Sequence, residues 1–148
     1  MQDSCQSPSS TSKPGGASPA VDLKDVTKVK RYNSHPSGIE CILIIRGMNF
    51  DMGSAFKYVF RRQEKEFERS LKSALYYLKD QMEHRLQAVL DTGCVALIQK
   101  VIEAEENESA RSFYQAVWAY CNFPHDRHLL EAIKAVETLI KEGDGNAA

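Results

Sequence analysis

The sequence has no long apolar run, and this lack limits the classes of protein to which the chain can belong. Its uninterrupted apolar stretches, such as Cys41–Ile45, are no longer than six residues, far shorter than the roughly 20 residues that cross a bilayer as a helix. The N-terminus also has no apolar core of the kind found in signal peptides. We therefore expect a protein without a membrane partner that works in the cytoplasm.

Cysteine is scarce and shows no pairing motif. Four cysteines stand far apart, at Cys5, Cys41, Cys94 and Cys121. The last three lie among apolar residues in helical patterns, which is typical of buried free thiols in a reducing compartment. We expect no disulfide framework.

The sequence also lacks an excess of charge of one sign. Its 19 Lys and Arg residues balance 20 Asp and Glu residues, for a net charge of −1. No overall field would attract duplex nucleic acid or an anionic membrane, so any attraction for phosphate must be local. The chain also contains no Gly-x-x-x-x-Gly-Lys-Ser/Thr phosphate loop and no hydrolase signature of the Ser-His-Asp or Cys-His type.

The chain consists of a polar N-terminal tail followed by segments whose apolar residues recur with helical periodicity. Residues 1–27 are rich in Ser, Pro, Gly and Lys, and such a stretch cannot bury enough apolar surface to offset its ordering entropy. We expect a disordered tail there. No later stretch shows sustained period-two alternation, so the predicted fold is all-α, a small bundle of about six helices.

The predicted helices have recognisable starts and stops. A capping box at Ser37 and Glu40 would open the first helix, and Thr92-Gly93 would interrupt the chain after the third. Asn107 or Ser109 would cap the fifth helix. The expected ranges are about 37–47, 51–60, 66–90, 94–104, 109–121, and from a cap at Asp126 to just before Gly143.

The two halves resemble each other faintly. Phe56–Phe60 corresponds to Tyr114–Trp118, at an offset that drifts between about 55 and 59 residues along the chain. In the second half Gln115 replaces Lys57 and Ala119 replaces Arg61. We predict a binding unit at 28–91 and a second unit at 92–148 for scaffold or oligomer contacts. Chance helical periodicity is the alternative explanation.

A basic face in the first half is the main chemical feature. Lys57, Arg61 and Lys65 follow at i, i+4 and i+8, and Arg62 and Arg69 extend the patch. Cationic donors at helical spacing suit phosphate oxygens because they form charge-assisted hydrogen bonds in a fixed array. The plainer alternative is a solvated face with internal Glu–Lys pairs.

Two neighbouring features could complete a phosphate site. Gly53 and Ser54 stand at the expected start of the second helix, where free amides can receive an anion. His35 precedes Pro36 in extended backbone, and with Tyr32 it could contact a phosphate or a base. The alternatives are a simple capped helix start and a surface histidine.

A metal site is a weaker possibility. His125 and His128 can share a helix face beside Asp126, but no third ligand is evident. We therefore expect no metal site.

Two strings together resemble a known family. They are Tyr32–Ile42 and Met48–Tyr58, the second followed by Arg61-Arg62. They are similar to a family of small phage proteins, long known as a domain of unknown function, that includes the phage deoxynucleoside monophosphate kinase without a Walker loop. The match covers about residues 32–78. It depends on His35-Pro36, Gly38-Ile39-Glu40, Gly53, Lys57-Tyr58, Arg61 and Leu71-x-x-Ala74-x-x-Tyr77.

The resemblance implies a phage nucleotide-binding protein that transfers a phosphoryl group from a nucleoside triphosphate. Lys57 and Arg61 would be its catalytic residues, with ATP, and Mg²⁺ if the chain is a kinase, as cofactors. The residues implied to hold the nucleotide are Tyr32, His35, Glu40, Gly53, Ser54, Lys57, Tyr58, Arg61, Arg62 and Lys65.

The sequence departs from the family pattern at two places. Ser54 stands where the family has Asn, and Arg62-Gln63-Glu64-Lys65 replaces the family's Ala-Gly-Lys-Lys. If the family's exit loop holds the triphosphate, nucleotide binding could survive here without catalysis. A non-catalytic, oligomeric sponge for cyclic or modified nucleotide signals of anti-phage immunity is therefore the first alternative. A helical protein-interaction module is the second.

Overall fold

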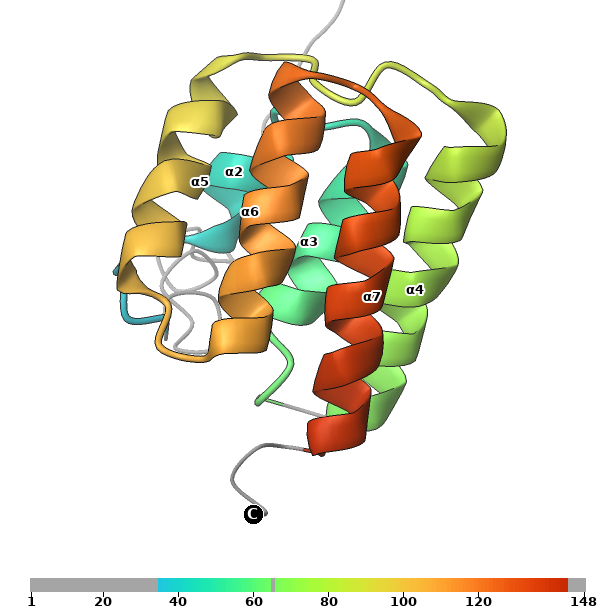
Figure 1. The fold of residues 1–148 in the computed structure, drawn as a ribbon. Helices are drawn as coiled ribbons and strands as arrows, with labels where there is room; N and C mark the ends of the chain where they lie inside the picture. Colours follow the sequence, from blue (N-terminus) through green and yellow to red (C-terminus); the bar gives the residue numbers. More distant parts are fainter. Residues whose placement is uncertain (1–34, 65, 144–148) are drawn as a thin grey trace, which may run out of the picture. The chain divides into compact units, whose positions relative to one another are not determined.

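The computed structural model describes residues 35–64 and 66–143, and it confirms the all-α prediction. Within these ranges every regular element is a helix (Figure 1). The predicted tail, Tyr32 and Lys65 lie outside the described residues. The helices are α2 (Cys41–Ile45), α3 (Phe50–Phe60), α4 (Phe67–His84), α5 (Gly93–Ala104), α6 (Glu108–Asn122) and α7 (Asp126–Glu142).

The helices pack so that the two predicted units share one core. The α3 helix lies along α4, α6 lies along α7, and α7 packs in turn against α4. The short α2 helix contacts both α3 and α5, and in Figure 1 α2 and α3 lie behind the front layer of helices. At the centre, Phe56 contacts Phe60, Phe113 and Tyr114 through ring pairs with centroids 5.2 to 6.5 Å apart.

Helix α3 carries apolar residues at the spacing of a single helical face, and this spacing predicts a stripe that faces the core. Its members, spaced at i, i+3, i+4, i+7 and i+8, are all buried: Met52, Ala55, Phe56, Val59 and Phe60. The helix begins at Phe50, one residue before the expected start, because the Asn49 side chain accepts a hydrogen bond from the Met52 amide.

The predicted capping box at the first helix is wrong. Helix α2 begins at Cys41, and Glu40 at its N-cap position makes no side-chain capping bond. Gly38 has a φ of 75°, which is not helical, so the chain turns there before the helix starts. The Ser37 hydroxyl instead accepts a hydrogen bond from the Ile39 amide at 3.2 Å.

The third helix is shorter than predicted. It stops at His84, because Arg85 adopts a left-handed conformation with a φ of 50°. The following segment pairs with the residues before α3, where the Asn49 amide donates to the Ala88 carbonyl at 2.8 Å. The buried Gln81 side chain donates to the Leu86 carbonyl and thus helps to hold this segment away from the helix axis.

The later helices begin close to the predicted residues. Asn107 rather than Ser109 caps α6, accepting from the Ala110 amide at 2.9 Å. The predicted cap of α7 is displaced by one residue, since the His125 ring caps the helix and Asp126 is its first residue. Among the described helices, none combines the length and the apolar character that crossing a membrane requires.

Candidate ligand-binding hollows

The end of α3 and the start of α4 enclose a hollow of about 220 Å³, which we call the Lys57 hollow. Lys57, Tyr58 and Arg61 line it from the last turns of α3. Glu66 and Ser70 line it from the start of α4. Lys57 and Arg61 stand one helical turn apart, so both side chains leave the helix on the same face, as the i, i+4 spacing predicts.

The two cations of the Lys57 hollow both influence the pKa of a buried thiol. Burial raises the pKa of Cys41 to about 12, and the charges of Arg61 and Lys57 oppose this rise. Both cations therefore lower the pKa of the same buried thiol relative to the value that burial alone would give. Arg61 also has a carboxylate partner, because its Nε lies 3.7 Å from Glu64 Oε1.

A row of aromatic rings adjoins the Lys57 hollow. The Tyr58 and Tyr77 rings are nearly parallel, with centroids 6.1 Å apart. The Lys57 ammonium lies 4.7 Å from the centroid of the Tyr58 ring. Phe50 and Tyr76 meet Tyr77 edge-on and are 74% and 65% exposed. A cationic hollow thus stands beside rings that are open to solvent.

His35 and Arg62, both predicted to contact phosphate, lie in a different place. They line a second hollow of about 320 Å³ together with Glu105, and we call it the Glu105 hollow. The His35 Nε2 atom lies 3.0 Å from Glu105 Oε1, and Arg62 Nη2 lies 3.4 Å from Glu105 Oε2. The three residues are 5 to 9% exposed. The His35 ring also stacks on Phe60 at 4.7 Å.

The Glu105 carboxylate is already the hydrogen-bond partner of both His35 and Arg62. Burial opposes its ionisation, but hydrogen bonds from His35 and the Asn107 amide, with the charge of Arg62, outweigh burial and lower the pKa of Glu105. An incoming phosphate would therefore have to displace a carboxylate. Glu105 was missed in the sequence because it is 70 residues from His35 along the chain, and only the tertiary fold joins them.

The remaining predicted residues lie elsewhere on the first three helices. Gly53 packs against α2, where an added Cβ would stand 3.2 Å from the Ile45 carbonyl oxygen. Its amide donates to the Asn49 carbonyl. Ser54 is half-buried on α3, and Glu40 is half-buried just before α2.

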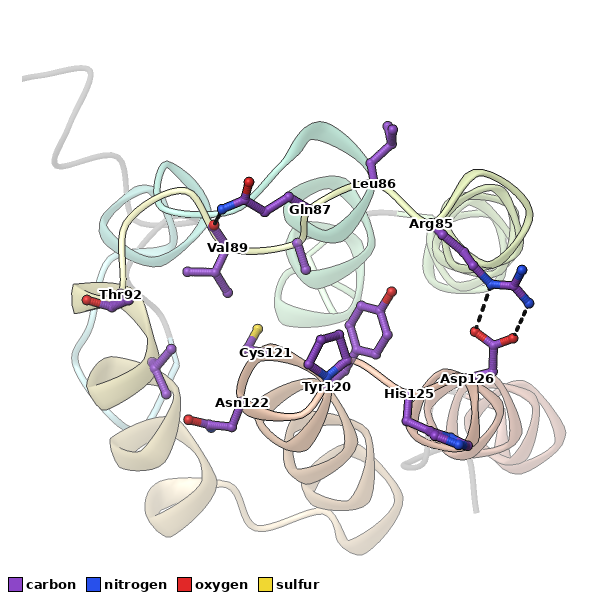
Figure 2. A pocket seen from close by; sticks show the side chains of 13 residues that line it. Arg85, Leu86, Gln87, Val89, Thr92, Tyr120, Cys121, Asn122, His125 and Asp126 are labelled. Carbon is purple, nitrogen blue, oxygen red and sulfur yellow. Dashed lines mark hydrogen bonds and ion pairs between the residues drawn. The ribbon is translucent and has the colours of Figure 1, made fainter.

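A third hollow in the described part of the chain, larger than the first two, was not anticipated. It measures about 890 Å³ and lies between the segment after α4 and the turn between α6 and α7. In Figure 2 an ion pair between Arg85 and Asp126 flanks it, and Tyr120 and Cys121 lie along the α6 side. The sequence gives no signal for this hollow, since it results from the early end of α4.

The two histidines considered as metal ligands are engaged separately. His125 Nδ1 accepts from the Arg127 amide, while His128 Nδ1 lies 3.3 Å from Glu131 Oε1. Over residues 35–64 and 66–143, no group of three or more His, Cys, Asp or Glu side chains is arranged to hold a metal ion.

Comparison with known proteins yields no relative: no family model, no curated protein and no solved structure matches the chain. The fold places the chain among small helical bundles. Its hollows are the features of this bundle that could bind a ligand.

Proposed function

We propose that the chain binds a small phosphorylated ligand of the nucleotide class at the Lys57 hollow. The observation that supports this most directly is the placement of Lys57 and Arg61 on one wall of that hollow, with Ser70 lining it from α4 beside Glu66. Guanidinium and ammonium groups form charge-assisted bonds to phosphate oxygens, and a hydroxyl can add a neutral one.

The size of the hollow limits which part of a nucleotide it would take. At about 220 Å³ it is smaller than the roughly 300–1,000 Å³ of a site that encloses a drug-sized ligand. The phosphate end would therefore enter, and the base would remain outside. There the base would meet the rings of Tyr58 and Tyr77, since stacking on aromatic side chains tolerates any base.

Binding without turnover is the form of this proposal that we favour. His35 and Arg62, which the family resemblance implies as phosphate ligands, are held by Glu105. Phosphoryl transfer depends on positive charge around the transferred group, and these two groups would supply less of it. A phage protein of this kind would sequester a nucleotide signal rather than convert it.

A ligand screen tests the proposal. We expect a panel of nucleoside monophosphates, triphosphates and cyclic nucleotides to contain at least one compound that raises the melting temperature. A ligand at 100 times its Kd stabilises the fold by about 2.7 kcal/mol. Lys57→Ala should weaken that ligand about tenfold or more, because a hydrogen bond to a charged group contributes roughly 1.5–3 kcal/mol.

The matched control is Lys100→Ala, which removes an exposed lysine from α5 that does not line the hollow. Its affinity should equal that of the unchanged chain. If no compound in the panel shifts the melting temperature, the proposal fails and the protein-interaction module becomes the better hypothesis. Equal affinity of Lys57→Ala and the unchanged chain would also contradict it.

Phosphoryl transfer is the second candidate, because the placement of Lys57 and Arg61 in one hollow suits a kinase as well as a protein that only binds nucleotides. Incubating each deoxynucleoside monophosphate with ATP separates the two forms. Binding alone predicts that both nucleotides are recovered unchanged. A diphosphate product that disappears in Lys57→Ala would establish the kinase instead.

A further inference from the structure

The outward face of α4 carries an ordered pattern of charge that the proposed function does not use. One side of the helix presents five residues at i, i+3, i+7, i+11 and i+14, all of them exposed except the fourth, which is half-buried. These residues, which we call the α4 stripe, are Arg69, Lys72, Tyr76, Asp80 and Glu83. The stripe therefore runs from two cations through one aromatic ring to two carboxylates.

No described helix covers this stripe. Helix α4 packs against α3 and α7 and lies at the edge of the helix layer in Figure 1. The Arg69 and Lys72 side chains are 81% and 64% exposed, and Tyr76 is 65% exposed. An exposed tyrosine flanked by charges is typical of the centre and rim of a protein interface.

We propose that the α4 stripe is the contact between two copies of this chain, paired with their α4 helices antiparallel and Tyr76 on the two-fold axis. Residues equally distant from Tyr76 then face each other. Lys72 meets Asp80 of the second copy, and Arg69 meets its Glu83. A parallel pairing would instead bring like charges together, so the pattern favours the antiparallel arrangement alone.

The symmetry of this pattern identifies the partner. A two-fold contact needs a surface that is complementary to itself. The α4 stripe meets this condition because its two halves carry opposite charge at equal distances from the centre. Phe50, which meets Tyr77 edge-on beside Tyr76 and is 74% exposed, adds apolar surface near the axis.

The two outer charges of the stripe, Arg69 and Glu83, are exposed and available for such a contact. Within one copy Arg69 pairs with Glu66 at 3.3 Å, Lys72 pairs with Glu68 at 2.8 Å, and the half-buried Asp80 pairs with His84 at 3.4 Å. Exposed pairs of this kind contribute little to stability, so they can be exchanged for pairs across the interface at small cost. The stripe spans roughly 21 Å of helix, which corresponds to a small interface and a weak dimer.

Sedimentation velocity on the full chain, over about 1 to 500 μM, tests the proposal. The unchanged chain should pass from monomer to dimer within this range. Arg69→Glu and Glu83→Lys should each weaken the dimer at least about tenfold, because each places like charges together twice. An equimolar mixture of the two variants should form a mixed dimer, since both of its contacts are then attractive.

Two further variants complete the test. The double variant Arg69→Glu with Glu83→Lys should dimerise like the unchanged chain, and Lys100→Glu on α5 should have no effect. Circular dichroism confirms that each variant is folded. A chain that stays monomeric at every concentration overturns the proposal. So does a dimer that either single variant leaves intact, or a mixture of the two that stays monomeric.

Discussion

Replacing Glu105 with alanine gives the most direct test of how the described helices are held together. The Glu105 side chain accepts hydrogen bonds from His35 Nε2, Arg62 Nη2 and the Asn107 amide, and the residue is 6% exposed. Its loss leaves the Arg62 guanidinium, 5% exposed, without its carboxylate. Removing one partner of a buried ion pair costs about 3–5 kcal/mol.

We expect a loss near the lower limit, about 3 kcal/mol, because the contact between Arg62 and Glu105 is long at 3.4 Å and Arg62 also donates to the Val59 carbonyl. For a domain of this size the melting temperature should fall by about 12 °C, at roughly 4 °C for each kcal/mol. Urea denaturation followed by circular dichroism measures the free energy of unfolding.

The controls for this prediction come from the same helix. Glu105→Gln keeps an oxygen acceptor but loses the charge, so its loss of stability should be intermediate. Glu103→Ala removes an exposed carboxylate two residues earlier and should change the unfolding free energy by less than about 0.5 kcal/mol. If Glu105→Ala and Glu103→Ala prove equally stable, the argument for a buried ion-pair cluster is refuted.

The same cluster predicts a dependence on pH. Because the pKa of Glu105 is lowered in the folded chain, its contribution is present above the unfolded value of about 4.3. It is lost as the pH falls through the folded value. The difference in stability between the unchanged chain and Glu105→Ala should therefore shrink as the pH is lowered from about 5 to 3. A difference that stays constant would contradict this assignment.

Three further substitutions test local features by the same denaturation assay. Gly47→Ala would place a Cβ 2.9 Å from the Asp91 carbonyl oxygen and should cost about 1–3 kcal/mol; an unchanged stability would contradict the close packing. Burial, a hydrogen bond with Asp80 and the negative charge of Asp80 together raise the pKa of Asp51 to about 6. Asp51 therefore favours folding at low pH, and this contribution to stability is lost as the pH rises through 6. Asp51→Asn should therefore gain roughly 1–3 kcal/mol over the unchanged chain between pH 4 and 8, and an equal pH dependence of the two would refute the assignment. Asn107→Ala removes the α6 cap and should cost about 1 kcal/mol, whereas Ser109→Ala, two residues after the cap, should cost less.

Features that depend on near neighbours were predictable from the sequence. The spacing of Met52, Phe56 and Val59 indicated which face of α3 is buried, and all three are buried. The spacing of Lys57 and Arg61 likewise indicated that their side chains share one side of the helix, and both line one hollow. Helical periodicity fixes such relations because residues three and four apart are neighbours whatever the rest of the chain does.

Features that depend on distant residues were not predictable. The apolar stripe after Gln81 continued through Leu86 and Val89, and the sequence alone favoured a longer helix there. The structure ends that helix at His84, because the buried Gln81 side chain bonds to Asn49, Leu86 and Tyr120 and the next segment pairs with the start of α3. Buried polar groups must find partners, but the pattern of residues does not name those partners.

The sequence by itself therefore determined the helical class, the inward faces of the helices and the gathering of Lys57 with Arg61. Only the tertiary structure decided that His35 and Arg62 meet Glu105 rather than the Lys57 hollow. The physical reason is that opposite charges attract at short range. Which carboxylate comes within about 4 Å of which cation depends on how the helices pack, and charge composition does not contain that information.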